Sequence, residues 1–240
     1  MEVKDVKVLI ACEESQRICL AFRERGFEAY SCDLMECSGE HPEYHIKGDC
    51  SPFLEEGPYD FKTMDGTEHH IDEWTLIISH PSCVYLTIAA NKYYDIEKYG
   101  QKAIERYEKR EEAVEFFMKC INAPAKYVVV ENPVCIMSTR YRKPDQIIQP
   151  YWFGHSVSKK TCLWTKNLPK LEPTQIVEPE KIHSKGRTGG YSGPSWYVTD
   201  ENGKILSWKD PRTSIIRSKT YPGVAEAIAQ QWGDYILKGE

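Results

Sequence analysis

Two polar motifs follow apolar stretches of this chain, and both contain residues that can take part in covalent chemistry. "LIISHPSC" ends at Cys83, three residues after His80, and "VVVENP" contains Glu131 and Asn132. A thiolate adds to a conjugated ring, and a nearby carboxylic acid can protonate the ring that accepts it. A single cysteine after a strand is more often a structural thiol, so Cys83 gains significance only if the fold brings Glu131 close to it.

Five apolar runs, over residues 6–12, 27–34, 45–50, 74–80 and 125–133, are typical of the strands that would position these motifs. Apolar residues at helical spacing predict a helix that ends at Gly26, a long amphipathic helix over 98–122 and a final helix over 221–237. We expect the polar segment 51–73 to be a loop, and 146–154 and 160–168 to be later strands.

The alternation of strands and helices predicts an α/β fold of the Rossmann-like kind, with a mainly parallel sheet covered by helices on both faces. A chain of 240 residues fits one domain, which we expect to span residues 1–240. Residues 182–212 are rich in Gly, Ser, Pro and Tyr. They are expected to form a short insertion or a hairpin that faces the substrate, with "DENGK" as its turn.

The carboxyl ends of parallel strands share one edge of the sheet, which is where ligands of such folds bind. The residues expected there are Cys12-Glu13-Glu14, Asp33, Asp49, His80-Pro81-Ser82-Cys83 and Glu131-Asn132-Pro133. Asp33 has the position of an acid that binds a ribose, although a carboxylate that caps a turn would look the same. The first loop, "ACEESQ", has no glycine, which argues against a cofactor with a pyrophosphate.

Glu131 lies at an abrupt strand end, after four apolar residues and before Asn132 and a proline. Partial desolvation at that position is expected to raise its pKa and make it a proton donor near neutral pH. A carboxylate that caps the next helix or turn is the structural alternative.

Composition, charge and cysteine content narrow the classes of protein to which this chain could belong. Hydrophobic residues make up 41% and charged residues 28%, no run is long enough for a membrane helix, and the N-terminus lacks a signal peptide. We therefore expect a cytoplasmic protein whose nine cysteines are reduced, mostly buried thiols.

The net charge of −5 is unusual for a nucleic-acid enzyme, although basic residues are frequent in the C-terminal half. No metal is expected, because Cys32, Cys37, His41, His45 and Cys50 match no common zinc spacing.

"HPSC" and "ENP" on successive strand ends resemble the Pro-Cys and Glu-Asn motifs of cytosine carbon-5 DNA methyltransferases. Most of the chain also resembles a phage and prophage group of short DNA methyltransferase-like proteins, through "ACEESQ", "GHSVSKKTCLW" and "YPGVAEAIAQQW". The resemblance implies a class I, S-adenosylmethionine-dependent fold that acts on cytosine in DNA, in the host cytoplasm if the chain is phage-encoded.

The same resemblance implies roles for individual residues. Cys83 would attack carbon 6 of a flipped-out cytosine, and Glu131 with Asn132 would complete the catalytic group. The cofactor-binding residues would be Cys12, Glu13, Glu14, Asp33, Asp49, His80 and Pro81, with "PGVAEA" as a last wall of the cofactor site.

Three features differ from the pattern of the proven enzymes. The first loop lacks Phe-x-Gly-x-Gly, Ser82 replaces the proline beside the nucleophile, and only residues 182–212 could serve for target recognition. Two alternatives therefore stay open. One is an enzyme that modifies a free pyrimidine nucleotide such as a cytosine nucleotide. The other is a nucleotide- or nucleic-acid-binding phage protein without methyl transfer.

Overall fold

The computed structural model describes residues 1–184, 191–194, 198, 202, 204–207 and 210–239. Its main sheet has seven strands in the order β3-β2-β1-β6-β7-β9-β8. The strands of this sheet are β1 (Lys7–Ala11), β2 (Glu28–Asp33), β3 (His45–Lys47), β6 (Leu76–Ser79), β7 (Tyr127–Pro133), β8 (Gln146–Ile148) and β9 (Thr161–Lys166). Two further pairs, β4 (Tyr59–Lys62) with β5 (Glu68–Ile71) and β10 (Lys181–Ser184) with β11 (Tyr191–Pro194), are antiparallel hairpins.

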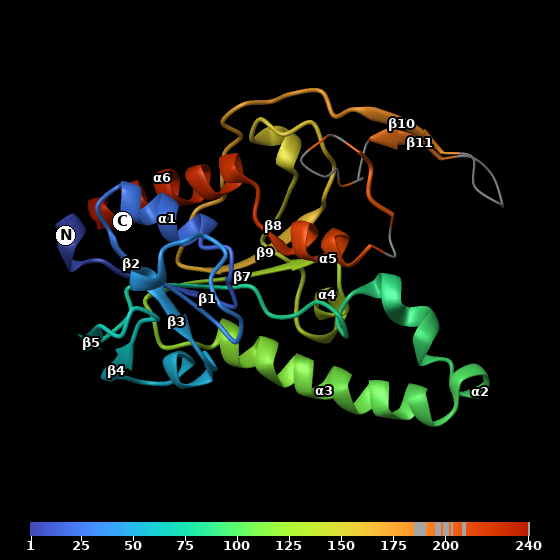
Figure 1. Ribbon diagram of the computed structural model, residues 1–240, viewed down its shortest axis with the longest axis horizontal. Helices are drawn as coiled ribbons and strands as arrows, with labels where there is room; N and C mark the ends of the chain where they lie inside the picture. The colour runs from blue at the N-terminus through green and yellow to red at the C-terminus, as the bar shows by residue number, and fades with distance from the viewer. Residues whose placement is uncertain (185–190, 195–197, 199–201, 203, 208–209, 240) are drawn as a thin grey trace.

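Helices cover both faces of the main sheet. On one face lie α1 (Arg17–Glu24) and α6 (Pro222–Lys238), side by side, and on the other lies α3 (Gln101–Ile121) (Figure 1). The shorter helices are α2 (Ile96–Tyr99), α4 (Met137–Arg140) and α5 (Pro211–Ser218), with 3-10 turns η1 (Val3–Asp5), η2 (Pro42–Tyr44), η3 (Ser51–Leu54), η4 (Ile88–Tyr94) and η5 (Pro150–Trp152). The predicted α/β class, with a mostly parallel sheet between helices, is confirmed.

The strands in the centre of the sheet are buried on both sides, as their continuous apolar sequences require. Leu9, Ile77 and Val128 pack in the core on the α3 side, whereas Ile10 and Ile78 pack in the core under α1 and α6. Successive side chains of each strand therefore contribute to opposite cores. The two cores fix the strand ends, and with them the polar residues that follow each strand.

The last two strands of the sheet differ from the rest in direction. β9 pairs antiparallel with β7, and β8 pairs antiparallel with β9, so β8 returns to the direction of β7. Because β9 runs backwards, the residues that precede it reach the same edge as the residues that end β7. Residues far apart in the sequence are brought together there.

Two expectations about elements need correction. The segment 51–73 is not only a loop, because β4 and β5 form a hairpin in it. The hairpin is stable because Phe61 stacks with His69 and packs against Trp74 in an aromatic cluster, an arrangement that local sequence does not specify. The long helix is also divided, since Gly100 between α2 and α3 has a positive φ (53°) that does not continue a right-handed helix.

At the start of the segment 182–212, which was predicted as an insertion or a hairpin that faces the substrate, β10 and β11 pair antiparallel. The "DENGK" segment proposed as a turn lies partly outside the described residues, which include only Asn202 and Lys204 of that run.

Candidate functional site

The order of the strands places a topological switch point between β1 and β6. From β1 the chain proceeds outward to β2 and β3, and it then returns to β6 on the other side of β1. The connections after β1 and β6 therefore diverge, which leaves a crevice at their carboxyl ends where ligands bind in open α/β sheets. A pocket of about 490 Å³ lies at this point, within the range of small-molecule sites.

We call this hollow the acidic pocket, because four carboxyl residues line it and few cations oppose them. The lining residues are Cys12–Ser15 after β1, Asp33–Met35 after β2, Gly48–Ser51 after β3, His80 and Ser82 after β6, Phe116 of α3, and Ser218–Thr220. Six predicted cofactor-binding residues are among them: Cys12, Glu13, Glu14, Asp33, Asp49 and His80. Pro81 is not among the residues that line the pocket.

The loop after β1 turns without glycine because two other residues adopt left-handed conformations. Cys12 has φ 60° and Gln16 has φ 58°. Such backbone is costly for residues other than glycine and is found mainly at functional sites. The fully buried Gln16 side chain supports the turn by donating to the carbonyl of His41 (2.8 Å) and accepting from its N–H (3.2 Å).

The buried side chain of Glu13 caps the N-terminus of α1. Its carboxylate accepts hydrogen bonds from the backbone N–H groups of Ile18 (2.8 Å) and Cys19 (3.2 Å). Burial raises the pKa of Glu13, while His80 and the two N–H donors act in the opposite direction. Since the Glu13 carboxyl group already satisfies the helix terminus, the terminus is not available to a phosphate.

The two aspartates of the acidic pocket each use one oxygen in a local turn. Asp33 Oδ1 accepts from the N–H of Met35 (2.9 Å), and Asp49 Oδ1 accepts from the N–H of Ser51 (2.9 Å). Hydrogen bonds from Ser51 lower the pKa of Asp49, so this group stays ionised at neutral pH. The turns fix both side chains at the edge of the pocket.

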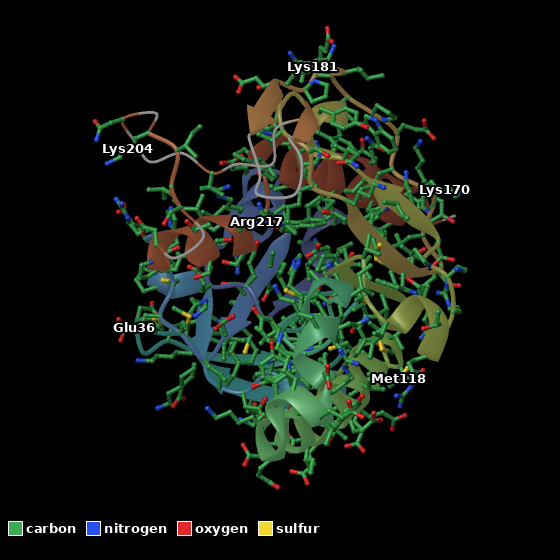
Figure 2. The ribbon with its side chains drawn as sticks, turned by 90° about the vertical axis from the view of Figure 1, so that its right-hand side faces the viewer. Glu36, Met118, Lys170, Lys181, Lys204 and Arg217 are labelled. Carbon is green, nitrogen blue, oxygen red and sulfur yellow. The ribbon has the colours of Figure 1, made fainter. Side chains whose placement is uncertain are left out.

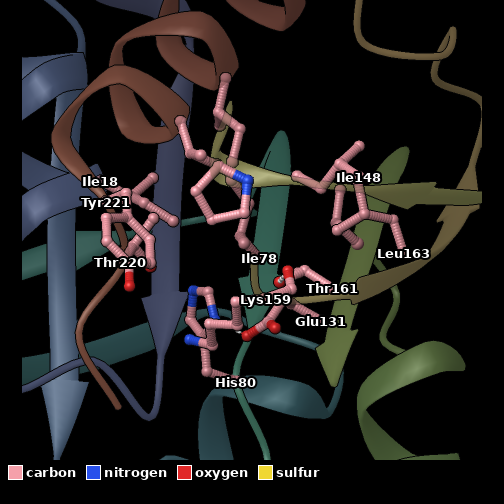
Figure 3. Close-up of a pocket in the computed structure, with 14 residues that line it drawn as sticks. Ile18, Ile78, His80, Glu131, Ile148, Lys159, Thr161, Leu163, Thr220 and Tyr221 are labelled. Carbon is pink, nitrogen blue, oxygen red and sulfur yellow. Dashed lines mark hydrogen bonds and ion pairs between the residues drawn. The ribbon is translucent and has the colours of Figure 1, made fainter. Parts of the chain in front are cut away.

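At the ends of β6 and β7, His80 and Glu131 form a direct pair. His80 Nδ1 lies 3.0 Å from Glu131 Oε2, and the side chains are only 14% and 19% exposed (Figure 3). The pairing of β6 with β7 brings them together, because Ser79 lies opposite Val130 in the sheet. His80 also lines the acidic pocket, so it connects that pocket to Glu131.

The expected raised pKa of Glu131 is wrong in sign. Burial does raise it, but the hydrogen bond from His80 and the charges of Lys159 and His80 outweigh burial and leave the pKa of Glu131 below its ordinary value. Glu131 is therefore a carboxylate in the free protein. Any proton that it delivers must come from a partner, and His80 is in contact with it.

Glu131, His80, Lys159 and Thr161 line a small cavity of about 30 Å³ under α6, which is close to the volume of one water molecule (Figure 3). Lys159 and Thr161 were not among the predicted site residues. They reach Glu131 because β9 runs antiparallel to β7, which places Thr161 opposite Pro133. Lys159 lies in the segment "GHSVSKKTCLW", but the residues of that segment do not indicate that Lys159 approaches Glu131.

The loop that carries Cys83 is fixed to the end of β7 and to the segment that follows it. Asn132 Nδ2 donates to the carbonyl of Pro81 (2.7 Å), which is a contact between the two predicted motifs. Backbone hydrogen bonds also link Ile136 to Leu86 and Ile88 to Val134. The two motifs, distant in sequence, thus form one rigid unit, as their position on neighbouring strand ends predicts.

Cys83 itself is half-buried, and the pKa of its thiol is raised. Burial raises the pKa of its thiol, and the negative charge of Glu131 raises it further, while Lys159 and Arg217 lower it. Lys159 Nζ donates to the carbonyl of Arg217 (2.9 Å), so these two cationic residues lie together near the thiol. Figure 2 shows Arg217 on α5, nearer the centre of the molecule than Lys170 and Lys181 at its edges.

These charges predict how the reactivity of Cys83 depends on pH. Since only the thiolate is alkylated, the rate with iodoacetamide should rise about tenfold per pH unit through pH 8.5, where an ordinary cysteine begins to level off. Lys159→Gln should slow alkylation at pH 8, because it removes a charge that favours the thiolate. Peptide-resolved mass spectrometry measures both effects. Lys160→Gln is the control, and a plateau below about pH 8 would contradict the assigned environment.

The C-terminal segment forms part of the site, at a position slightly different from the expected one. Ser218, Lys219 and Thr220, directly before "YPGVAEA", line the acidic pocket, whereas Tyr221 and Val224 line the small cavity. Lys219 Nζ donates to Ser38 Oγ (2.7 Å), which connects this segment to the loop after β2. The residues directly before α6 therefore form one wall of the acidic pocket.

Within the group of His and Cys residues considered for zinc (Cys32, Cys37, His41, His45 and Cys50), His45 and Cys50 have different neighbours. The His45 ring contacts Ser31 Oγ (2.8 Å) and the carbonyl of Met35 (2.9 Å), and Cys12 Sγ lies 3.6 Å from Cys50 Sγ. All nine cysteines are free thiols, as expected. Over the part of the chain that the structure describes, no three His, Cys, Asp or Glu residues are arranged to hold a metal ion.

No protein-family model matches the chain, and no curated protein is similar to it in sequence. Among solved structures, it is similar to a "putative DNA modification methyltransferase" encoded within an E. coli prophage, with a TM-score of 0.42 and 13% sequence identity. The match covers 72% of this chain and 52% of the other, so this chain spans about half of that protein's length. A likeness this distant carries no inference about substrate or residues. Among the helices described, none is sufficiently long and apolar to span a membrane.

Proposed function

We propose that this protein is an S-adenosylmethionine-dependent methyltransferase that modifies carbon 5 of cytosine in DNA, with Cys83 as the nucleophile. The observation that carries the proposal is the position of the Cys83 loop and the His80–Glu131 pair together at the edge of the acidic pocket. A nucleophile, a proton source and a small-molecule site thus share the switch point of the sheet.

The sheet supports the methyltransferase class independently of the two motifs. Numbered consecutively, the seven strands of the main sheet have the order 3-2-1-4-5-7-6, with the seventh antiparallel to its neighbours. This order places the switch point beside the first strand, where the class I, S-adenosylmethionine-dependent fold that the resemblance implies would bind its cofactor. Substrate and cofactor bind such sheets beyond the carboxyl ends of the strands.

The acidic pocket fits the charge of this cofactor. S-adenosylmethionine has a positive sulfonium and a positive ammonium group against one carboxylate, and it has no phosphate. Glu14, Asp33 and Asp49 would favour such a cation, and the capped N-terminus of α1 would not favour a phosphate. Asp33 would hold the ribose hydroxyls, Asp49 the adenine, and the backbone of Cys12–Glu14 the methionine end. When bound, the cofactor supplies an electrophilic methyl group.

The residues of the chain would activate the cytosine. Cys83 gives its proton to a solvent water and forms a bond from Sγ to carbon 6, and the electron pair of the ring moves toward nitrogen 3, which takes up a proton. Since Glu131 is ionised, that proton passes through Glu131 from a His80 that carries a proton on both ring nitrogens and is left neutral. Glu131 also accepts from the amino group of the base. Carbon 5 becomes nucleophilic and is methylated. Loss of the proton on carbon 5 to a solvent water, with return of the nitrogen 3 proton through Glu131 to His80, then expels the thiolate and restores the ring.

Two observations favour the non-catalytic alternative. The pKa of Cys83 is raised and that of Glu131 is lowered, and each shift is opposite to the protonation state that the reaction requires. A bound substrate would have to reverse both. A nucleotide-binding protein that keeps the fold without the chemistry needs neither change.

The alternative of an enzyme that acts on a free nucleotide is supported by the net charge of −5, which does not favour binding of a DNA duplex.

The test is to incubate the protein with S-adenosylmethionine and either cytosine-containing DNA or dCMP, and to quantify 5-methylcytosine nucleosides by mass spectrometry. We expect product from DNA, and a covalent adduct with 5-fluorocytosine DNA, because fluorine on carbon 5 blocks the final elimination. Cys83→Ala should abolish both. Cys37→Ala, which alters another half-buried free thiol, should retain both.

Product from dCMP alone would favour the nucleotide-level enzyme. The absence of product and of adduct, with no S-adenosylmethionine binding in calorimetry, would refute methyl transfer and leave the binding protein as the explanation.

A further inference from the structure

A second hollow, apart from the acidic pocket, lies beside the loop that carries Cys83. Its volume is about 330 Å³, and its lining residues are Tyr85, Tyr93, Tyr99, Lys102, Glu105, Arg106 and Lys109. We call it the tyrosine pocket. It is built by the loop after β6, by η4 and α2, and by the first turns of α3, at the end of α3 opposite the β4–β5 hairpin (Figure 1).

The tyrosine pocket combines aromatic rings with positive charge. Three of its residues are cationic and one is acidic, although the whole chain has a net charge of −5. Tyr93 is 44% exposed, and its ring lies 5.8 Å from that of Tyr99. Exposed rings beside lysine and arginine can stack on a flat ligand while the cations neutralise an attached anion.

Arg106 organises the rings of the tyrosine pocket. Its guanidinium lies 5.0 Å from the centre of the Tyr85 ring, 5.6 Å from that of Tyr93 and 5.1 Å from that of Tyr94. Its Nη2 donates to the carbonyl of Val84 (2.8 Å), while its buried Nε has no hydrogen-bond partner within the described part of the chain. A buried donor without a partner is costly unless a ligand or water satisfies it.

The tyrosine pocket is connected to the candidate nucleophile by short covalent and hydrogen-bonded links. Tyr85 is two residues after Cys83, and Arg106 holds the carbonyl of the residue between them. The buried Arg110 and Tyr94 add hydrogen bonds to the carbonyl of Tyr85, each 2.9 Å long. These links fix the position of the tyrosine pocket relative to Cys83, as is expected of two parts of one binding surface.

We propose that the tyrosine pocket binds a nucleotide of single-stranded DNA next to the one presented to Cys83. A base stacks on Tyr93 and Tyr99, and Lys102 and Lys109 contact the phosphates that flank it. This proposal rests on the proposed function, since it names the form of DNA that the site takes. It does not require the methyl transfer itself.

Single-stranded DNA fits these features better than a duplex does. Stacking on side chains requires bases that are unpaired and accessible, which a duplex offers only after unpairing. The cations are few and local, whereas duplex binding depends on many phosphate contacts. A stacking pocket also gives affinity without a large recognition domain, because every base has a flat face.

The experiment measures binding of fluorescein-labelled oligo(dT) by anisotropy, with no S-adenosylmethionine present. Because this probe has no cytosine, it cannot react with Cys83, so the result is independent of the catalytic proposal. We expect oligo(dT) to bind more tightly than a duplex of equal length. Tyr93→Ala should weaken binding about tenfold, the scale of one lost base stack. Tyr141→Ala, which removes another exposed tyrosine, should leave the affinity unchanged.

The charges are tested by the dependence of affinity on salt. Lys102→Ala with Lys109→Ala should lower the slope of log affinity against log salt concentration by about 1.4, or about 0.7 for each lost phosphate contact. Lys126→Ala with Lys143→Ala is the matched control, since neither residue lines the pocket. Circular dichroism confirms that each variant is folded.

The proposal is overturned if the wild-type protein binds oligo(dT) no better than duplex, or if the Tyr93 and lysine variants retain wild-type affinity and salt slope. Binding of oligo(dT) by a protein that makes no 5-methylcytosine would support this proposal while refuting the proposed function, so the two can fail separately.

Discussion

Replacement of Glu131 by glutamine is expected to lower methyl transfer to cytosine about a thousandfold, within the range that positioned acid–base groups contribute. Glutamine has nearly the same shape, but it cannot receive a proton from His80 and pass it to the base. Initial rates of methyl transfer to cytosine-containing DNA measure this loss.

The same substitution should make Cys83 more reactive toward iodoacetamide. Glu131 is one of the charges that raise the pKa of the Cys83 thiol, so its removal increases the thiolate fraction at a given pH. Turnover and alkylation should therefore change in opposite directions, which general damage to the fold would not produce. Glu111→Gln, at a surface carboxylate paired with Arg140, is the control. Unchanged turnover, or a parallel loss of both signals, would exclude the assigned role.

Replacement of Gly223 by alanine is expected to destabilise the protein by about 3 kcal/mol or more, at the upper end of the cost of overpacking. A Cβ atom at this position would lie 2.1 Å from the carbonyl oxygen of Phe153 and 3.2 Å from His155 Nε2. Both contacts are tight, and the first is with backbone, which cannot rotate away. The Gly223 N–H also donates to His155 Nε2 at 3.0 Å.

The effect of Gly223→Ala can be measured by urea unfolding, and it should extend to the site. Two and three residues before Gly223, Tyr221 lines the small cavity and Thr220 lines both this cavity and the acidic pocket. Displacement of the start of α6 should therefore also weaken binding of S-adenosylmethionine. Gly48→Ala is the control for the unfolding measurement alone, since no atom lies within 4 Å of the Cβ that it adds but Gly48 itself lines the acidic pocket. An unfolding midpoint equal to that of wild type would contradict this prediction, because it would show that the start of α6 shifts to accommodate the added methyl group at little cost in free energy.

The sheet and the edge it presents could be predicted because each strand is a local apolar run with a polar end. Asp33, Asp49 and His80 follow β2, β3 and β6, and the parallel arrangement brings them to one pocket. The direction of β9 could not be predicted, because "TCLWTK" is equally suited to either direction. That direction decides that Lys159 rather than Lys166 approaches Glu131.

Other features depend on contacts that no local pattern describes. The sign of the pKa shift of Glu131 is set by His80 and Lys159, which come from other strands. The left-handed backbone at Cys12 and Gln16 replaces the glycines that the first loop lacks, and it is held by the loop after β2. The β4–β5 hairpin escaped prediction because its strands have only four residues each, among many charges.

The hydrogen bond from Asn132 to Pro81, with the backbone links around Leu86 and Ile136, has a consequence for the entropy of substrate binding. A loop fixed in this way cannot swing over an incoming base, so the base must move to Cys83. The conformational freedom of these groups is lost once, when the chain folds, and not again at each binding event. Affinity for substrate is then not reduced by the ordering of the nucleophile, and the stability of the sheet itself keeps Cys83 in place.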